Sequence, residues 1–187
     1  MAYSFLRRIF MDKKFAVKDL IVASFLLAFG VILPMIFHAF GMMGNIFLPM
    51  HIPVLIGGFL LPPSLALVLG VLTPLISSVT TGMPVLFPMA VIMMFELATY
   101  GFVAALIVNK SKISNIITLI ISMISGRIVA GFVVFVLAAF FNVKMNPIMF
   151  VKGAIITGLP GIIIQIIIIP SIITVLKFGF KKGIAKN

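Results

Sequence analysis

Long apolar runs alternate with short polar, Pro-rich or Gly-rich segments along most of the chain. A helix needs about 20 apolar residues to cross the hydrocarbon core of a bilayer. Because most of the runs approach or exceed that length, the pattern predicts an all-α integral membrane protein, built as a bundle of six transmembrane helices. The predicted spans are residues 19–40, 49–62, 64–80, 86–108, 114–141 and 147–176.

The second predicted span is the weakest, because its length of about 14 residues lies below the usual spanning range. Pro62 and Pro63 separate it from the third span, and two adjacent prolines interrupt a continuous helix. Either residues 49–62 and 64–80 are two broken spans, or one of them is a re-entrant segment. We favour two spans.

The amino-acid composition supports a membrane location. Hydrophobic residues occupy 63% of the 187 positions and the mean hydropathy is +1.38, whereas a soluble domain is about half apolar. Such a chain has too few polar residues to cover a water-facing surface. We therefore predict a single membrane domain over residues 1–187, with a basic segment at 1–18, the helix bundle at 19–176 and a basic tail at 177–187.

The 14 basic residues, set against 3 acidic ones, are distributed unevenly about the predicted spans. Six spans place both termini on one side, and cytoplasmic loops of membrane proteins carry an excess of Lys and Arg. The opposite side holds only Lys144 and Lys152. The distribution therefore predicts cytoplasmic termini in a multi-pass protein of the cell membrane, and it explains the net charge without nucleic-acid binding. The basic residues on the predicted cytoplasmic side are Arg7, Arg8, Lys13, Lys14, Lys18, Lys110, Lys112, Lys177, Lys181, Lys182 and Lys186.

Two ionisable residues lie within predicted spans, Glu96 in the fourth and Arg127 in the fifth. At about 1.5 Å per helical residue, Glu96 lies roughly 15 Å below the outer end of its span, and Arg127 roughly 20 Å above the inner end of the next. The two side chains are therefore expected at similar depth in neighbouring antiparallel helices. We predict an ion pair, because each charge lowers the cost of burying the other. The pair either only stabilises the bundle or also faces a ligand cavity.

Other polar side chains gather toward the predicted outer face, and each has a structural and a functional interpretation. His51, Asn45 and Asn146 either cap or border helices or contact a ligand. Lys152 either extends along the helix to reach the surface or contacts the ligand. The predicted substrate-binding residues are Arg127, Glu96, Lys152, His51, Asn45 and Asn146.

The sequence predicts no enzyme and no metal site. The chain has no Cys, and it contains no HExxH, paired carboxylates, nucleophile elbow or Walker loop. Its two His have no carboxylate or Cys at the same depth to complete a metal site. We therefore predict no catalytic residue, no metal and no cofactor, so an ATP-driven process would need its ATPase on another chain.

Small residues recur four positions apart in several spans, and such ridges let helix backbones approach closely. Each ridge either packs the bundle internally, which we favour, or docks a partner membrane protein. Gln165 lies deep in the last span, where a hydrogen bond between helices is its expected role. The ridges are Ser24 with Ala28, Gly101 with Ala105, Ser122 with Gly126 and Ala130, and Ala154 with Gly158.

Two blocks, LPMHIPVLIGGFLL at 48–61 and GVLTPLISSVTTGMPVLFPMAVIMMFELATYGFVAAL at 70–106, resemble the substrate-binding S components of energy-coupling factor (ECF) vitamin transporters. The resemblance covers about residues 19–176. It implies a vitamin pocket near the outer face, closed by the loop between the first two spans and the loop after the third. It also implies a membrane-embedded T component and two cytoplasmic ATPases as partners, with Ser24 and Ala28 docking the T component.

Within these blocks, LPMHIP and FELATYG are most similar to S components assigned to pantothenate. A small anionic ligand rich in hydroxyl groups suits the residues at hand. Arg127 or Lys152 would pair with its carboxylate, while His51, Asn45 and Asn146 would meet hydroxyl and amide groups.

Two other classes of protein stay open. One is a solitary secondary transporter or channel in which Glu96 carries protons, and the other is a membrane scaffold without a ligand. A ligand retained by the purified protein would argue against the scaffold. Stable co-purification with a T component and ATPases would argue against the solitary transporter.

Overall fold

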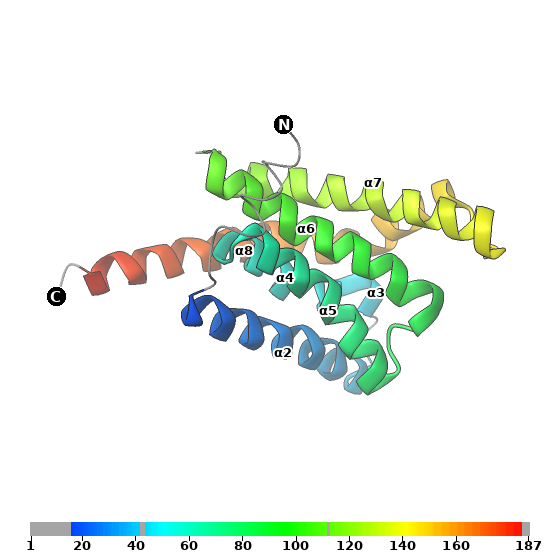
Figure 1. Ribbon diagram of the computed structural model, residues 1–187, viewed down its shortest axis with the longest axis horizontal. Helices are drawn as coiled ribbons and strands as arrows, with labels where there is room; N and C mark the ends of the chain where they lie inside the picture. The colour runs from blue at the N-terminus through cyan, green and yellow to red at the C-terminus, as the bar shows by residue number, and fades with distance from the viewer. Residues whose placement is uncertain (1–15, 42–43, 112, 185–187) are drawn as a thin grey trace.

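The computed structural model describes residues 16–41, 44–111 and 113–184, apart from the side chains of Asn45 and of residues 177–184. These residues form helices and contain no strand, which confirms the predicted all-α fold class (Figure 1). The helices are α2 (Val17–Ala39), α3 (Gly44–Phe47), α4 (His51–Leu60), α5 (Pro63–Thr81), η1 (Leu86–Ala90), α6 (Val91–Lys110), α7 (Asn115–Phe141) and α8 (Pro147–Ile184).

Five of these segments are long and apolar enough to cross a membrane, whereas α4 is shorter than the sequence pattern predicts. Its 10 residues extend about 15 Å, which is half of a hydrocarbon core of about 30 Å. Pro62 and Pro63 follow it directly, and α5 begins with Pro63 at its first position, where a missing backbone N–H is tolerated. The described residues thus contain five full-length candidate spans, and α4 is a half-length apolar helix among them.

The half-length helix α4 lies inside the bundle, in contact with α2, α5, α6 and α8. Its residues are largely buried, and two glycines let it touch its neighbours. A Cβ atom on Gly58 would lie 2.7 Å from the Cβ of Ala104 and 2.9 Å from the carbonyl oxygen of Gly101. Only the short helix α3 and a turn precede its first residue, His51, along the chain.

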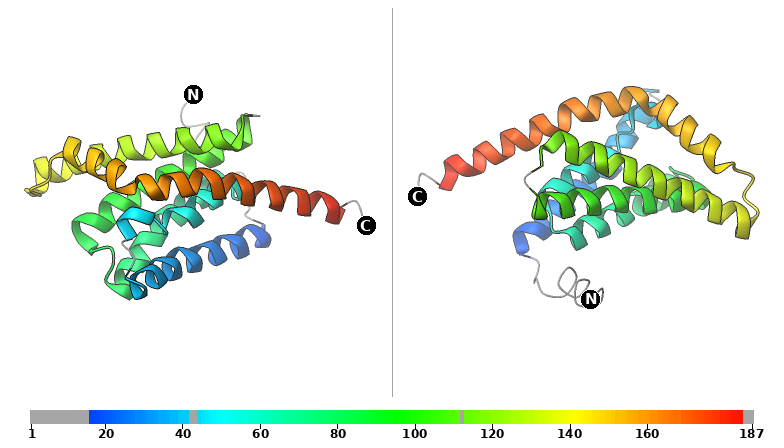
Figure 2. Two further views of the ribbon diagram at one scale, coloured as in Figure 1. Left: turned by 180° about the vertical axis from the view of Figure 1, so that it is seen from behind. Right: turned by 90° about the horizontal axis from the view of Figure 1, so that it is seen from above.

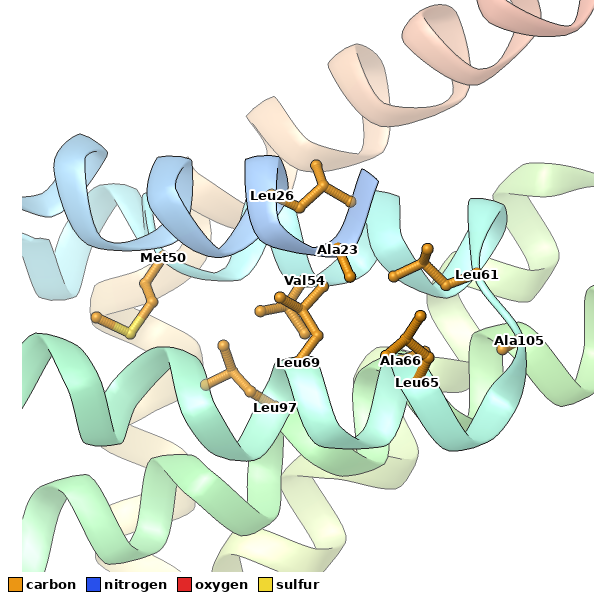
Figure 3. Close-up of a cluster of buried hydrophobic side chains, with 10 residues drawn as sticks. All are labelled: Ala23, Leu26, Met50, Val54, Leu61, Leu65, Ala66, Leu69, Leu97 and Ala105. Atoms are coloured by element: carbon orange, nitrogen blue, oxygen red, sulfur yellow. The ribbon is translucent and has the colours of Figure 1, made fainter. Parts of the chain in front are cut away.

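Helix α6 lies at the centre of the bundle and packs on α4, α5 and α7. Small residues bring its backbone close to α5, since a Cβ on Gly101 would lie 2.6 Å from the carbonyl oxygen of Ala66. The internal role predicted for the Gly101–Ala105 ridge is therefore confirmed. Figure 3 shows the adjoining apolar cluster, in which side chains of α2, α4, α5 and α6 meet. The buried residues of this cluster are Ala23, Leu26, Met50, Val54, Leu61, Leu65, Ala66, Leu69, Leu97 and Ala105.

Helix α8 runs along one side of the bundle and is bent, and its final part extends away from the other helices (Figure 2). Pro160 and Pro170 lie inside it, and an internal proline removes a helical hydrogen bond and favours a bend. The start of α2 and the end of α8 lie at one end of the bundle, as Figure 1 shows. The loops after α5 and α7 lie at the opposite end, which we call the loop end.

Candidate ligand-binding site

A cavity of about 730 Å³ occupies the loop end of the bundle, beyond the first residues of α4. Residues of α2, α3, α4, α6, α7 and α8 line it, together with Met83 and Pro84 from the loop after α5. Most of the wall is apolar, including the side chains of Met50, Met93 and Phe150. The volume lies within the range of about 300–1,000 Å³ that is typical of small-molecule sites. The cavity lies beyond the first residue of the short helix α4, where α3 and the turn before α4 form part of its wall.

Glu96 and Arg127 form an ion pair on the wall of this cavity. Nη1 of Arg127 lies 2.7 Å from Oε1 of Glu96, and the side chains are 11% and 3% exposed. The predicted pair is therefore confirmed. The hydroxyl of Tyr100 donates a hydrogen bond of 2.7 Å to the same Oε1. His51 is the fourth member of this group, with Nε2 at 3.9 Å from that oxygen, beyond hydrogen-bonding distance.

Local sequence explains how these groups come together. Tyr100 follows Glu96 by four residues on α6, so both side chains lie on one face of the helix. Gly126 precedes Arg127 on α7, and a Cβ atom there would collide with the ring of Tyr100 and lie 2.9 Å from the carbonyl oxygen of Glu96. The missing side chain lets α7 approach α6 closely enough for the guanidinium to reach the carboxylate. Gly126 with Ser122 and Ala130 thus forms a buried, internal ridge, as predicted.

The cavity wall carries both charge and hydrogen-bonding groups. Glu96 and Arg127 are the formally charged residues among those that line the cavity, so their charges cancel when the histidines are neutral. A guanidinium has five N–H donors in a planar fork, and contact with one carboxylate oxygen leaves most of them free for a second acceptor. His38 and Thr157 add polar groups at the wall, and the hydroxyl of Thr157 donates to the carbonyl of Gly153.

The other predicted site residues do not line the cavity, or their side chains lie outside the described part of the structure. Lys152 is exposed on α8 and is not among the lining residues. Asn146 is exposed just before α8, where its Oδ1 accepts hydrogen bonds from the backbone N–H groups of Ile148 and Met149. Asn45 belongs to α3, but its side chain lies outside the described part of the structure. Ligand contacts for Lys152, Asn146 and Asn45 stay predictions.

Tyr100 is a member of the site that the sequence analysis did not single out. Its side chain is 1% exposed, and its ring lies against that of His51 with centroids 5.6 Å apart. The available signal was its position four residues after a carboxylate in an apolar helix, since a buried phenol needs a hydrogen-bond partner. That spacing alone does not show whether the hydroxyl of Tyr100 bonds to Glu96 or lies at the membrane surface.

A second cavity of about 400 Å³ lies between α6, α7 and α8, and it is lined largely by isoleucines. Leu48, His51 and Arg127 line both cavities and therefore stand between them. Gln165 of α8 borders the second cavity and donates a hydrogen bond of 3.3 Å to the carbonyl oxygen of Leu48. The bond therefore joins α8 to the segment between α3 and α4, instead of joining two helices as the sequence analysis expected.

Many large apolar side chains are exposed on the outward surface of the bundle, and Ser24 and Ala28 form a strip of small residues among them. Both residues are exposed on α2, whereas Ala23 and Leu26 face the bundle. Large side chains, Phe25 and Phe29 among them, flank the strip. The ridge on α2 therefore differs from those on α6 and α7, which are buried within the bundle.

Comparison with known proteins gives one match. A family model described as "ECF transporter, substrate-specific component" matches residues 18–173, which is most of the chain. No curated protein and no solved structure matches. The matched region begins with α2 and ends within α8, so it includes both cavities and the Glu96–Arg127 pair.

Proposed function

We propose, because this chain belongs to the family of substrate-specific components of ECF transporters, that its larger cavity captures a vitamin or vitamin precursor at the outer face of the cell membrane. Proteins of this kind are membrane subunits that bind small molecules and act with T and ATPase subunits. Partner ATPases would then drive uptake. The observation that carries the proposal is the 730 Å³ cavity with the guanidinium of Arg127, 11% exposed and paired with Glu96, on its wall.

The best candidate for the ligand is pantothenate. It has one carboxylate, two hydroxyls and an amide on a short branched chain, and the cavity offers a matching set of groups. The free donors of Arg127 suit the carboxylate, because charge-assisted hydrogen bonds to a carboxylate are among the strongest in proteins. Thr157 and His38 are placed at the wall for hydroxyl or amide groups, and the methionines suit the methyl groups.

The orientation of this uptake rests on the positive-inside rule. Of the eleven basic residues assigned to one side, five are described: Lys18 lies at the start of α2, Lys110 ends α6, and Lys177, Lys181 and Lys182 belong to the final part of α8. The other six lie outside the described residues. If that end is cytoplasmic, the cavity lies in the outer half of the membrane, toward the loop end. A substrate would then enter from outside, and α3 with the loop after α5 would cover it.

The exposed strip of Ser24 and Ala28 is the proposed docking surface for the membrane-embedded T component. Helices associate in lipid by close van der Waals packing, for which small side chains in one strip are suited. In this chain the other small-residue ridges on α6 and α7 are already occupied by internal contacts. The ridge on α2 is therefore the one of these three that a partner helix can reach.

Mass spectrometry of small molecules released from the purified protein tests this function. Pantothenate, or another small carboxylate, should be recovered from wild type and be depleted in Arg127→Ala purified in the same detergent. Lys144→Ala is the matched control, because Lys144 is an exposed cation in the loop before α8. Wild-type protein that releases no small molecule, and that binds none of a panel of vitamins in titration, would overturn the proposal.

A further inference from the structure

His51 lies at the junction of the two cavities with its hydrogen-bonding capacity unused. Its side chain is 4% exposed, and neither ring nitrogen has a hydrogen-bond partner among the described residues. Burying an unpaired polar group is unfavourable, so a buried imidazole without a partner needs an explanation. One acceptor is close by, since Oε1 of Glu96 lies 3.9 Å from Nε2. A shift of about 1 Å would bring that pair to hydrogen-bonding distance.

In the structure, other donors already occupy that acceptor. Oε1 of Glu96 contacts Nη1 of Arg127 and accepts a hydrogen bond from Tyr100, each at 2.7 Å. Arg127 therefore holds the carboxylate in a position that leaves His51 just out of reach. A ligand anion would compete with Glu96 for the guanidinium, and the buried carboxylate would then need a replacement donor.

His51 is the group placed to supply this donor. Among the helices that contact α4, α5 has no ionisable residue. On α2, Lys18 and Asp19 lie in the first turn and do not line the cavity, and no hydrogen bond or ion pair joins His38, in the last turn, to Glu96. On α8, Gln165 already donates to the carbonyl of Leu48, and Lys152 is exposed. On α6, Tyr100 already donates to Glu96.

We infer that Glu96 exchanges partners during ligand binding, passing from Arg127 to His51 while Tyr100 keeps its hydrogen bond. The N–H donors that Arg127 used for Glu96 can then bind an anionic group in the cavity. The neutral imidazole donates its Nε2–H, so the exchange requires no proton transfer. His51 is thereby a positioning residue that acts through Glu96. The identity of the anion rests on the proposed function, whereas the exchange itself can be tested without a ligand.

Nitrogen NMR of the imidazole groups tests the exchange directly, because the chain has only two histidines. Protein labelled with ¹⁵N-histidine is compared with its Arg127→Gln variant, and His38→Gln assigns the two sets of signals. Removing the guanidinium should shift the Nε2 signal of His51 toward the hydrogen-bonded position and slow exchange of its proton with solvent. Lys144→Gln, which removes an exposed cation, should leave the His51 signals unchanged. Arg127→Met provides a second variant if the glutamine variant does not fold.

Unfolding temperatures give an independent measure of the same contact. His51→Leu should lower Tm by at least about 3 °C more in the Arg127→Gln background than in wild type. The reason is that His51 donates a hydrogen bond to Glu96 only when Arg127 is replaced. His51→Gln, which keeps a donor, should restore part of the difference. An equal effect of His51→Leu in both backgrounds would contradict the exchange.

Adding pantothenate to the labelled wild-type protein separates the exchange from the proposed substrate. If both Arg127→Gln and pantothenate produce the His51 shift, the exchange and the substrate are supported together. If only the variant produces it, the exchange stands and pantothenate is excluded as the anion that releases Glu96. If His51 gives the same signals in wild type, Arg127→Gln and Arg127→Met, the exchange is wrong, whatever pantothenate does.

Discussion

Removal of Arg127 is the sharpest test of the buried ion pair. In Arg127→Ala, the carboxylate of Glu96 stays buried at 3% exposure and loses the cation that lies 2.7 Å away. Tyr100 still donates one hydrogen bond to it. Even with the second bond that the proposed exchange supplies from His51, hydrogen bonds from neutral donors compensate a buried charge only in part, so the variant should be much less stable than wild type.

The expected loss follows from the burial of the pair. Removing one partner of a buried ion pair lowers the free energy of unfolding by about 3–5 kcal/mol, because the remaining charge is left uncompensated. At about 2–4 °C per kcal/mol for a chain of this size, Tm should fall by about 6–20 °C. Glu96→Gln should lose less, about 1–3 kcal/mol, because the amide can still accept the hydrogen bond from Tyr100 and the guanidinium still borders the cavity. The double variant should lose at least about 1 kcal/mol less than the sum of the two.

Thermal unfolding of wild type, both single variants and the double variant in one detergent measures these differences. Lys144→Ala should stay within about 0.5 kcal/mol of wild type, since its side chain is exposed and outside the bundle core. Ligand titration adds the second readout, in which Arg127→Ala loses affinity and Glu96→Gln loses mainly stability. Additive losses of stability would show that the two residues are not coupled. Unchanged affinity in Arg127→Ala would remove Arg127 from the binding site.

Three further predictions concern docking, topology and helix contact. Ala28→Leu should abolish co-purification with a T component and uptake, while the isolated protein keeps its ligand affinity; an equal loss of ligand binding would indicate an internal role for the ridge. Since the chain has no native Cys, Asn187→Cys offers a single thiol, which an impermeant reagent should not label in intact cells, and labelling would refute a cytoplasmic C-terminus. Gly126→Ala should destabilise the bundle by about 1–3 kcal/mol, because the added methyl group meets the ring of Tyr100. The control Gly153→Ala, whose Cβ meets no atom within 4 Å, should not, and equal effects of the two would contradict the close contact.

Much of the fold could be predicted from the apolar runs alone. The predicted span 114–141 corresponds to α7 at Asn115–Phe141, and the break at Pro62 separates α4 from α5 as expected. The reason is that backbone N–H and C=O groups in lipid must bond within their own segment, which makes a long apolar run a helix. The pairing of Glu96 with Arg127 was predictable on similar grounds, because a charge in the membrane requires a partner at its own depth.

The length of α4 was not predictable in the same way. Residues 49–62 are apolar, yet the helix has 10 residues and lies among other helices. Apolar composition does not distinguish a helix that contacts lipid from one that is buried in protein, because both environments exclude polar side chains. The cavity lies beyond the start of that short helix, so the apolar pattern did not reveal its volume, and only the family resemblance implied a pocket there.

Only the tertiary structure decided which face of each helix is turned inward. These helices are apolar on all sides, so the periodicity that reveals the buried face of a helix in a soluble protein is weak here. Sequence spacing therefore grouped Ser24–Ala28 with the ridge of Gly126, although the first is exposed and the second buried. In the same way, Lys152 and Arg127 were equal candidates for a ligand, and packing alone placed one outside the cavity wall and the other on it. In a bilayer, the position of a residue along an apolar run determines its depth. The rotation of its helix depends instead on contacts with residues far away in sequence.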